Sequence, residues 1–407
     1  MDRFELVLKV GQLVSFKGSD PVRGEGIKRR FWKEEDLYIG INDGIVSKIT
    51  KDRIDGLEYL DCSDLVCFPG FIDCHTHIPF YEYRWEEFLM RAEGKSYMEI
   101  LKSGGGILNT MRQIRKADED TILEFNLKLL DEMLSKGYTT VEGKSGYGLE
   151  RESEMKQLRI LRRLSNIHPI DVVPTFLGAH AIPPEFDSSA KYLEYLVEEM
   201  LPEVKEYTEF VDIFCERGVF EPEEARTFLM KAREMGYKLR MHADEIENVG
   251  ATKLGIELKA VSVDHIVKVG KEEIEMLARS ETTAVLLPGT SFFLGKSFAP
   301  AREILDSGGI VALASDFNPG SSMVIDPMLI GFLGVMKLGM GVEEIVAGLT
   351  INPANVLGLS ETVGTVEEGK KADLVLMEIP DYRAFPYFVS HDKVRYVLKS
   401  GKVVYER

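Results

Sequence analysis

The stretch Leu65-Val66-Cys67-Phe68-Pro69-Gly70-Phe71-Ile72-Asp73-Cys74-His75-Thr76-His77 joins an apolar run to two histidines one residue apart. The apolar part predicts a buried strand, and residues i and i+2 of a strand point to the same side. His75 and His77 at the end of this strand would therefore direct two imidazoles at one point, as a first-row metal ion requires. An H-x-H pair alone is a weak signal, because both histidines could equally be polar residues of a loop.

Seven more apolar segments follow this strand, and helical patterns separate most of them. The eight strand candidates end near His77, Lys144, Ala179, Cys215, His242, His265, Pro288 and Asp316. Helical patterns between them cover, for example, residues 120–136, 152–164, 222–235 and 271–278. Eight strands that alternate with helices over about 250 residues predict an α/β fold, a (β/α)8 TIM-type barrel. The competing doubly wound sheet usually has a glycine-rich phosphate turn after its first strand, where this chain has His75 and His77.

Both ends of the chain have short strand patterns that differ from the alternating middle. Strand-like runs occur at 5–8, 37–41 and 44–49, and again at 372–377, 394–398 and 402–405. Asn42-Asp43-Gly44 predicts a tight turn between two of them. We therefore expect a small β-sandwich-like domain built from residues 1–66 and 364–407, with the catalytic barrel over residues 67–363.

The composition describes an acidic globular chain of 407 residues with a formal net charge of −17. This charge argues against a nucleic-acid partner, because a phosphate backbone would be repelled. The chain has no apolar run of about 18 residues that could cross a membrane, and its first residues lack the pattern of a signal peptide. Cys62, Cys67, Cys74 and Cys215 form no C-x-x-C pair, so we expect neither a structural zinc site nor a disulfide framework, and a cytoplasmic location.

Chemically reactive residues gather at the predicted strand ends. Five of the seven histidines lie there, with three carboxylates; these residues are His75, His77, His180, His242, His265, Glu216, Glu245 and Asp316. Active sites of such barrels lie at the C-terminal ends of the strands, so the side chains would meet at one rim. Clustered imidazoles and carboxylates are costly to bury without a cation, and three histidines with one aspartate suit zinc or iron(II). The other two histidines, His168 and His391, are expected at the surface.

Further short motifs extend along nearly the whole chain. They are Pro69-Gly70-Phe71-Ile72-Asp73 before His75 and His77, Arg84 with Glu86-Glu87-Phe88, Gly94-Lys95-Ser96-Tyr97, Gly104-Gly105-Gly106-Ile107-Leu108, and the segments 142–149, 178–181, 242–245 and 316–322. Together these motifs resemble the imidazolonepropionase family of the amidohydrolase superfamily, enzymes of histidine degradation that open a five-membered ring. The chain departs from the family at Tyr81-Glu82-Tyr83, where the family usually has small residues before the arginine. This difference affects the expected shape of the pocket mouth and not the expected chemistry.

The resemblance implies one zinc or iron ion per subunit, held by His75, His77, His242 and Asp316. The ion would activate a water that attacks the ring carbonyl carbon of 4-imidazolone-5-propanoate, and the product would be N-formimino-L-glutamate. Glu245 would carry the water's proton to the leaving nitrogen. His265 would stabilise the developing oxyanion or act as a further ligand. A homodimer is implied as well.

The resemblance also assigns substrate-binding residues. Four of them would bind the propanoate tail, namely Arg84, Tyr97, Tyr147 and His180. Asn318, Gly320 and Ser321 would contact the substrate just beyond Asp316. Arg84 could instead pair with Glu86 or Glu87, and the tyrosines could be packing residues. Lys144 or Glu216 could bridge a second metal, but structural ion pairing is favoured for both, and one metal is expected.

Two other functions compete with this interpretation. A metal-dependent deaminase of a purine, pyrimidine or related heterocycle would share the metal ligands, Glu245 and His265. It would differ at Arg84, because a neutral nucleobase has no anionic tail for an arginine to bind. A catalytically silent barrel is the second alternative, although it would have no reason to retain a full set of ligands.

Overall fold

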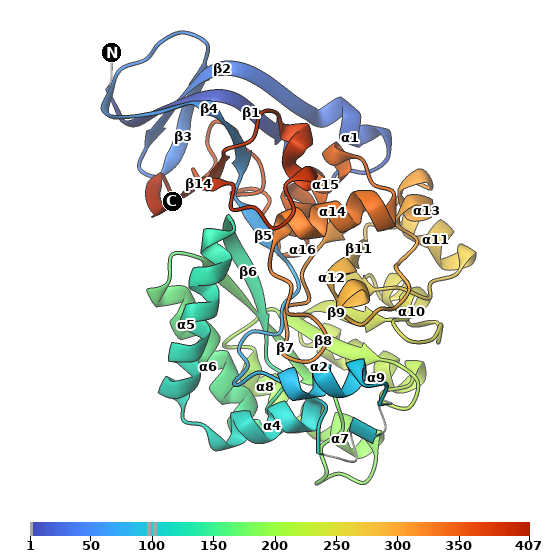
Figure 1. The fold of residues 1–407 in the computed structure, drawn as a ribbon. Helices are drawn as coiled ribbons and strands as arrows, with labels where there is room; N and C mark the ends of the chain where they lie inside the picture. Colours follow the sequence, from blue (N-terminus) through green and yellow to red (C-terminus); the bar gives the residue numbers. More distant parts are fainter. Residues whose placement is uncertain (1–2, 96–98, 101–103) are drawn as a thin grey trace.

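The computed structural model describes residues 3–95, 99–100 and 104–407. The chain folds into an eight-stranded parallel barrel sheet and a seven-stranded mixed sheet built from both of its ends (Figure 1). Both parts of the predicted architecture, the TIM-type barrel and the small β-domain formed by the two termini, are confirmed.

The barrel strands are neighbours in the order of the sequence. They are β5 (Phe71–Asp73), β6 (Tyr138–Lys144), β7 (Asp171–Ala179), β8 (Phe210–Cys215), β9 (Lys238–Ala243), β10 (Ser262–His265), β11 (Thr283–Leu286) and β12 (Val311–Leu313). All eight lie where the apolar segments predicted them. Parallel pairing throughout requires a crossover between successive strands, which the helices provide.

The barrel closes where the segments after β5 and β12 meet. The backbone N–H of Asp316 donates to the carbonyl of His75 at 3.0 Å, and the N–H of His77 donates to the carbonyl of Phe317 at 2.9 Å. We call these paired segments, residues 73–77 and 315–317, the barrel seam. The seam places the H-x-H pair of the first barrel strand directly beside the aspartate that follows the last.

Helices connect the barrel strands and follow the last one. Those before β12 are α2 (Trp85–Ala92), α4 (Ile107–Lys116), α5 (Glu119–Ser135), α6 (Arg151–Ile167), α7 (Ser189–Tyr195), η1 (Leu196–Met200), α8 (Leu201–Val204), α9 (Pro222–Glu234), α10 (Ala251–Glu257), α11 (Lys271–Ala278), α12 (Pro288–Phe293) and α13 (Ala301–Asp306). After β12 come α14 (Pro327–Leu338), α15 (Val342–Leu349), α16 (Ile351–Val356) and η2 (Tyr382–Tyr387). The helix predicted at 120–136 is α5, which begins where the Asp118 carboxylate accepts the N–H of Thr121.

The terminal sheet joins strands from both ends of the chain. Its order is β15-β14-β13-β4-β1-β2-β3, with β1 (Phe4–Phe16), β2 (Phe31–Asn42), β3 (Ile45–Thr50), β4 (Gly56–Pro69), β13 (Leu374–Met377), β14 (Val394–Lys399) and β15 (Lys402–Glu406). Helix α1 (Glu25–Arg30) lies between β1 and β2. Strand β4 joins the two halves, because it pairs with β1 on one side and with β13 on the other. The predicted boundaries at residues 66/67 and 363/364 stay a prediction.

Gly70 links the terminal sheet to the barrel, between β4 and β5. A Cβ atom at this position would lie 2.2 Å from Oγ1 of Thr139 on β6, so only glycine fits. The two sheets are therefore connected without a linker. Within the described ranges, no helix has both the length and the apolar character needed to cross a membrane. All four cysteines are buried free thiols.

Candidate metal centre and substrate site

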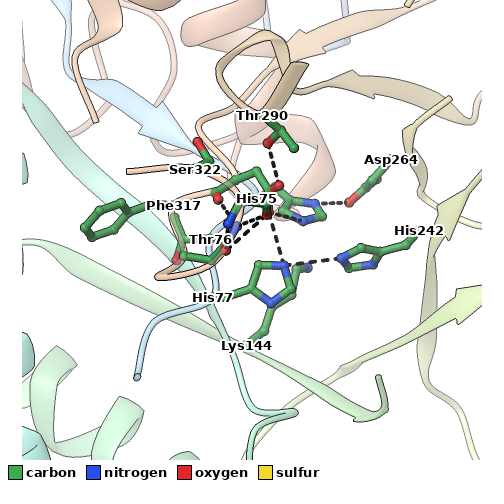
Figure 2. A network of polar contacts seen from close by, with 12 residues as sticks. His75, Thr76, His77, Lys144, His242, Asp264, Thr290, Phe317 and Ser322 are labelled. Carbon is green, nitrogen blue, oxygen red and sulfur yellow. Dashed lines mark hydrogen bonds and ion pairs between the residues drawn. The ribbon is translucent and has the colours of Figure 1, made fainter. Parts of the chain in front are cut away.

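Four side chains expected to bind a metal converge at the C-terminal ends of the barrel strands. Nε2 of His77 lies 3.2 Å from Oδ1 of Asp316 and 3.4 Å from Nε2 of His242. Nε2 of His75 lies 3.5 Å from the same oxygen of Asp316. Figure 2 shows the three imidazoles around one point, and all four side chains are almost completely buried.

The chemistry of this cluster fits a cation. Nε2 of His75 and Oδ1 of Asp316 are buried without a hydrogen-bond partner. Burial lowers the pKa of His242 to about 3, so its ring is neutral, and Nδ1 donates to Asp212 while Nε2 keeps its lone pair. Lone pairs from neutral imidazoles and a carboxylate thus face one common space, as a first-row metal ion requires.

Buried carboxylates fix the orientation of two of these imidazoles. Nδ1 of His75 lies 2.6 Å from Oδ2 of Asp264, and Nδ1 of His242 lies 3.1 Å from Oδ2 of Asp212. A carboxylate accepts only from a protonated Nδ1, so in a neutral ring each contact makes Nε2 the unprotonated nitrogen and directs it into the cluster. In addition, the Thr290 hydroxyl donates to Oδ2 of Asp316 at 2.5 Å, which leaves Oδ1 as the free oxygen of that carboxylate.

Two buried cations hold these carboxylates in place. Nζ of Lys144 lies 3.0 Å from Asp212 and 2.6 Å from Glu142, and the guanidinium of Arg240 contacts Glu142 at 2.9 Å and Asp264 at 2.8 Å. All five side chains are completely buried. The structural ion pairing predicted for Lys144 is therefore confirmed, and its ammonium group is engaged by two carboxylates.

Glu216 behaves differently from the prediction. Its carboxylate accepts the backbone N–H of Arg217 at 3.0 Å and of Ile246 at 2.8 Å, and no ion pair of this residue occurs among the described side chains. The prediction of an ion pair was wrong because peptide N–H groups, which the sequence does not place, satisfy this carboxylate. Through Ile246, Glu216 holds the loop that carries Glu245.

Glu245 and His265 lie beside the predicted metal ligands. Oε1 of Glu245 is 3.7 Å from Nδ1 of His265, and the His265 ring is 5.5 Å from that of His75. Ligand atoms of His75, His265 and Asp316 lie within 4.8 Å of one another. Burial raises the pKa of Glu245, and the nearby charge of Asp316 adds to this effect. His265 adopts a left-handed backbone conformation (φ 70°), an unusual state for a β-strand end and typical of a functional site.

Tyr147 and His180 form the wall beside His77. The His180 ring stacks on His77 at 5.0 Å, and the Tyr147 ring lies 5.3 Å from His180. Nδ1 of His180 lies 2.9 Å from the carbonyl of Gly146. Burial and the neighbouring imidazoles hold the pKa of His180 well below its usual range, so its ring is neutral. This pair can therefore offer a hydroxyl and an imidazole to a substrate without adding a charge.

Arg84 reaches the same region from the segment after β5. Its Nε and Nη2 donate to the two carboxylate oxygens of Glu87 at 3.0 and 2.8 Å, and both side chains are buried. Burial raises the pKa of Tyr147, and the charge of Arg84 acts against this rise. The alternative pairing of Arg84 with Glu87 therefore occurs, but in the interior and beside the predicted substrate residues rather than at the surface.

The turn after Asp316 contains the remaining predicted contacts. Oδ1 of Asn318 accepts the backbone N–H groups of Gly320 at 2.8 Å and Ser321 at 2.7 Å, and its Nδ2 donates to the carbonyl of Asp316 at 2.6 Å. The side chain of Asn318 is thus occupied in shaping the turn. Tyr97, predicted to bind the propanoate tail, lies outside the described residues.

One of the two histidines expected at the surface is buried. The side chain of His168 is 4% exposed, and its Nδ1 accepts the backbone N–H of Ile170 at 3.1 Å. The prediction was wrong because the turn from α6 into β7 covers a polar ring that has hydrogen-bond partners. His391 is exposed, as expected.

Comparison with protein families identifies the chain. The model of the Amidohydrolase family matches residues 66–404, which include the barrel and its described helices. The chain belongs to the amidohydrolase family.

Curated relatives of this amidohydrolase align over almost their full lengths. A protein of Kosmotoga olearia named imidazolonepropionase is 48% identical, over 98% of this chain and 98% of its own. A protein of Bacillus velezensis with the same name is 42% identical, over 99% of this chain and 97% of its own.

Solved structures of distant relatives share the amidohydrolase fold. An adenosine deaminase from Xanthomonas campestris with bound zinc superimposes with a TM-score of 0.73 at 15% identity, over 99% of this chain and 93% of that one. A triazine hydrolase variant gives a TM-score of 0.77 at 17% identity, over 98% of this chain and 94% of that one. At these identities the likeness concerns the fold alone.

Several residues of this amidohydrolase site were missed by the sequence analysis. Asp264 and Asp212 hold predicted ligand imidazoles, and Arg91 contacts the turn after Asp316. A signal was present for the aspartates, because each interrupts an apolar strand pattern, in Val263-Asp264-His265 and Val211-Asp212-Ile213. Arg91 carried no such signal on a partly polar helix, whereas Glu87 was already named as a possible partner of Arg84.

Proposed function

We propose that this amidohydrolase opens the ring of 4-imidazolone-5-propanoate by hydrolysis and forms N-formimino-L-glutamate, the third step of histidine degradation. The observation that carries the proposal is a buried arginine, Arg84. It lies beside the turn that follows Asp316, the aspartate predicted to bind the metal. Such a cation suits a substrate with a carboxylate tail. Relatives named imidazolonepropionase, at 41–48% identity over nearly the whole chain, support the same substrate.

In this proposal one zinc or iron ion is held by His75, His77, His242 and Asp316. When bound, the ion would lower the pKa of a water molecule toward neutrality and polarise the ring carbonyl. The water oxygen bonds to the ring carbonyl carbon, the adjacent carbon–nitrogen bond breaks, and the leaving nitrogen takes up a proton. The homodimer and the cytoplasmic location stay predictions.

Glu245 is the proposed proton carrier and His265 the group that stabilises the oxyanion. Glu245 must be ionised to accept the proton of water, and its partial burial raises its pKa. Turnover should therefore decline on the acid side at a higher pH than the ordinary pKa of a glutamate, 4.5, would give. His265, 3.7 Å away, would donate a hydrogen bond to the developing negative charge.

Arg84, Tyr147 and His180 are the proposed contacts of the propanoate tail, together with Tyr97. Glu87 occupies one edge of the Arg84 guanidinium, and the donors of the other edge stay available for a carboxylate. The turn residues Asn318, Gly320 and Ser321 would contact the substrate through backbone groups as well as side chains, because the Asn318 amide already holds the turn.

Turnover of freshly generated imidazolonepropanoate by the metal-loaded protein tests the proposal. We expect formiminoglutamate, with product formation abolished by a chelator and lowered by roughly two to four orders of magnitude in Glu245→Gln. Guanine and cytosine serve as competing substrates. Ammonia release from a nucleobase, with the imidazolone decaying only spontaneously, would instead indicate a deaminase.

Arg84→Ala separates the same two functions. Loss of a charge-assisted, bidentate contact should lower kcat/KM for imidazolonepropanoate by roughly one to two orders of magnitude. A deaminase acting on a neutral ring would keep most of its activity. Unchanged ring opening in this variant would contradict the proposed substrate.

A further inference from the structure

Helix α2 directs three charged side chains to one side. Arg84 precedes its first residue, and Glu87 and Arg91 follow at spacings of three and seven, which place them on one helix face. Arg84 and Glu87 are buried, whereas the neighbouring Trp85 and Glu86 are exposed. The charged face of α2 therefore points into the molecule.

Glu87 makes three hydrogen bonds on this face. Its carboxylate receives the bidentate contact of Arg84, and Oε1 also accepts the backbone N–H of Gly106 at 3.0 Å, at the residue before α4. Nε and Nη2 of Arg84 are thereby fixed, so the guanidinium has one orientation. The guanidinium packs against Gly320, where a Cβ atom would lie only 2.6 Å from Nη1 and 2.7 Å from both Cζ and Nη2.

Arg91 holds the same glycine from its carbonyl side. Nη2 of Arg91 donates to the carbonyl of Gly320 at 2.6 Å. The turn after Asp316 is thus fixed against the Arg84 guanidinium, and the missing side chain of Gly320 makes the close approach possible. Glu87 also offsets the repulsion between the two arginines. The pKa of Arg91 is lowered first by burial and then by the charge of Arg84, whereas the charge of Glu87 acts to raise it.

We propose that Glu87 and Arg91 are positioning residues for carboxylate recognition, which hold Arg84 and the Gly320 turn in one arrangement for the tail of the substrate. The inference rests on the proposed function. Two arginines and one glutamate leave one positive charge among these three side chains for an anionic tail. Because the guanidinium is already oriented, less conformational entropy is lost when the carboxylate binds. These residues therefore govern the preference for a charged tail rather than the chemistry of the ring.

The test compares binding of a charged and a neutral ligand to the metal-loaded, full-length protein. Calorimetric titration would use imidazole-4-propanoate and its propanamide. We expect Glu87→Gln to weaken binding of the acid roughly tenfold or more and to leave binding of the amide unchanged, so that the preference for the acid falls by the same factor. The exposed neighbour Glu86 gives the matched control, and Glu86→Gln should retain the wild-type preference.

Arg91→Gln is the second variant, in case Glu87→Gln does not fold. It removes the contact with Gly320 but leaves the Arg84–Glu87 pair, and it too should reduce the preference for the acid. Equal weakening of acid and amide, or an unchanged preference in both variants, would overturn the positioning role. Turnover of imidazolonepropanoate by the wild-type protein is measured separately, so that failure of the proposed function and failure of the positioning role give different results.

Discussion

His168 shows how a single buried imidazole depends on its protonation state. Nδ1 accepts the backbone N–H of Ile170, and Nε2 lies 3.2 Å from a carboxylate oxygen of Asp131. Only the neutral ring can accept at Nδ1 and donate at Nε2 at the same time. Burial lowers the pKa of His168 in the folded chain, against the opposing charge of Asp131.

This lowered pKa predicts a loss of stability in mild acid. The unfolded chain takes up the proton near the ordinary value of 6.5, and the folded chain does so only at a lower pH. The contribution of His168 is therefore complete above pH 6.5 and is lost as the pH falls from there toward the folded pKa. We expect the free energy of unfolding to fall between about pH 7.5 and pH 5. This fall should be larger in the wild type than in His168→Asn, and the difference should be of the order of 1 kcal/mol.

Denaturant titrations of both proteins at the two pH values measure this difference. His391→Asn is the control, because His391 is exposed and should leave the wild-type pH dependence intact. The same acid-induced loss in His168→Asn and in the wild type would show that other groups are responsible.

Four barrel strands contribute buried charged side chains that contact the predicted metal ligands directly or through one another. Strand β6 contributes Glu142 and Lys144, β9 contributes Arg240, and β8 and β10 contribute the aspartates that hold His242 and His75. Removing one member leaves a buried charge without its partner, which costs several kcal/mol. The strands thus fix the ligand imidazoles before any ion binds.

Asp264→Asn should weaken metal binding while the four ligands stay in place. An amide accepts less strongly from Nδ1 of His75 and leaves Arg240 with one fewer carboxylate, so we expect roughly a 10- to 100-fold loss of metal affinity. Competition with a coloured chelator measures the affinity without any use of activity.

Asp306→Asn, on the exposed side of α13, is the matched control and should bind metal like the wild type. Asp212→Asn, which changes the partner of His242, should resemble Asp264→Asn. Wild-type affinity in both buried variants would contradict the role assigned to these carboxylates.

Across the molecule, the metal cluster spans elements that are far apart in the sequence. His75 and His77 follow the first barrel strand, His242 lies on the fifth, and Asp316 follows the last. An ion held by all four would therefore connect both sides of the barrel seam. Binding to the folded state alone stabilises it, by about 4 kcal/mol at a thousandfold excess of free ion over Kd.

Metal removal should accordingly lower the melting temperature of the wild type, and the loss should be reversed when zinc or iron is restored. Differential scanning fluorimetry with and without a chelator measures the change. His242→Ala, which lacks one ligand, should show a much smaller response. An identical melting temperature with and without metal in the wild type would mean that the ion does not stabilise the seam.

Periodicity in the sequence was enough to predict the barrel and the terminal sheet. Apolar segments alternate with helical patterns, and strand ends such as Lys144 and Ala179 coincide with the observed ones. The H-x-H pair and the clustering of histidines at strand ends likewise predicted the group of side chains around His75.

Contacts between distant segments were harder to predict. Whether Arg84 pairs with Glu87, and whether that pair is buried, depends on how α2 packs against the turn at Gly320, and no local pattern contains this information. The same applies to His168 and Glu216, whose partners include backbone N–H groups. Solvent exposure and the hydrogen-bond partners of backbone groups are properties of the assembled fold, so they could not be predicted from these residues alone.

The barrel seam also has a consequence for biosynthesis. The backbone N–H of Ser315 donates to the side chain of Asp73 across 242 positions of the chain, and Asp316 follows at once. A nascent polypeptide therefore emerges from the ribosome with its first two ligand histidines long before the aspartate that completes the set. Strand β4 can pair with β1 early, but its second partner, β13, begins only at Leu374. The full set of four predicted ligands can consequently assemble only after Asp316 has been synthesised and the two sides of the seam have met.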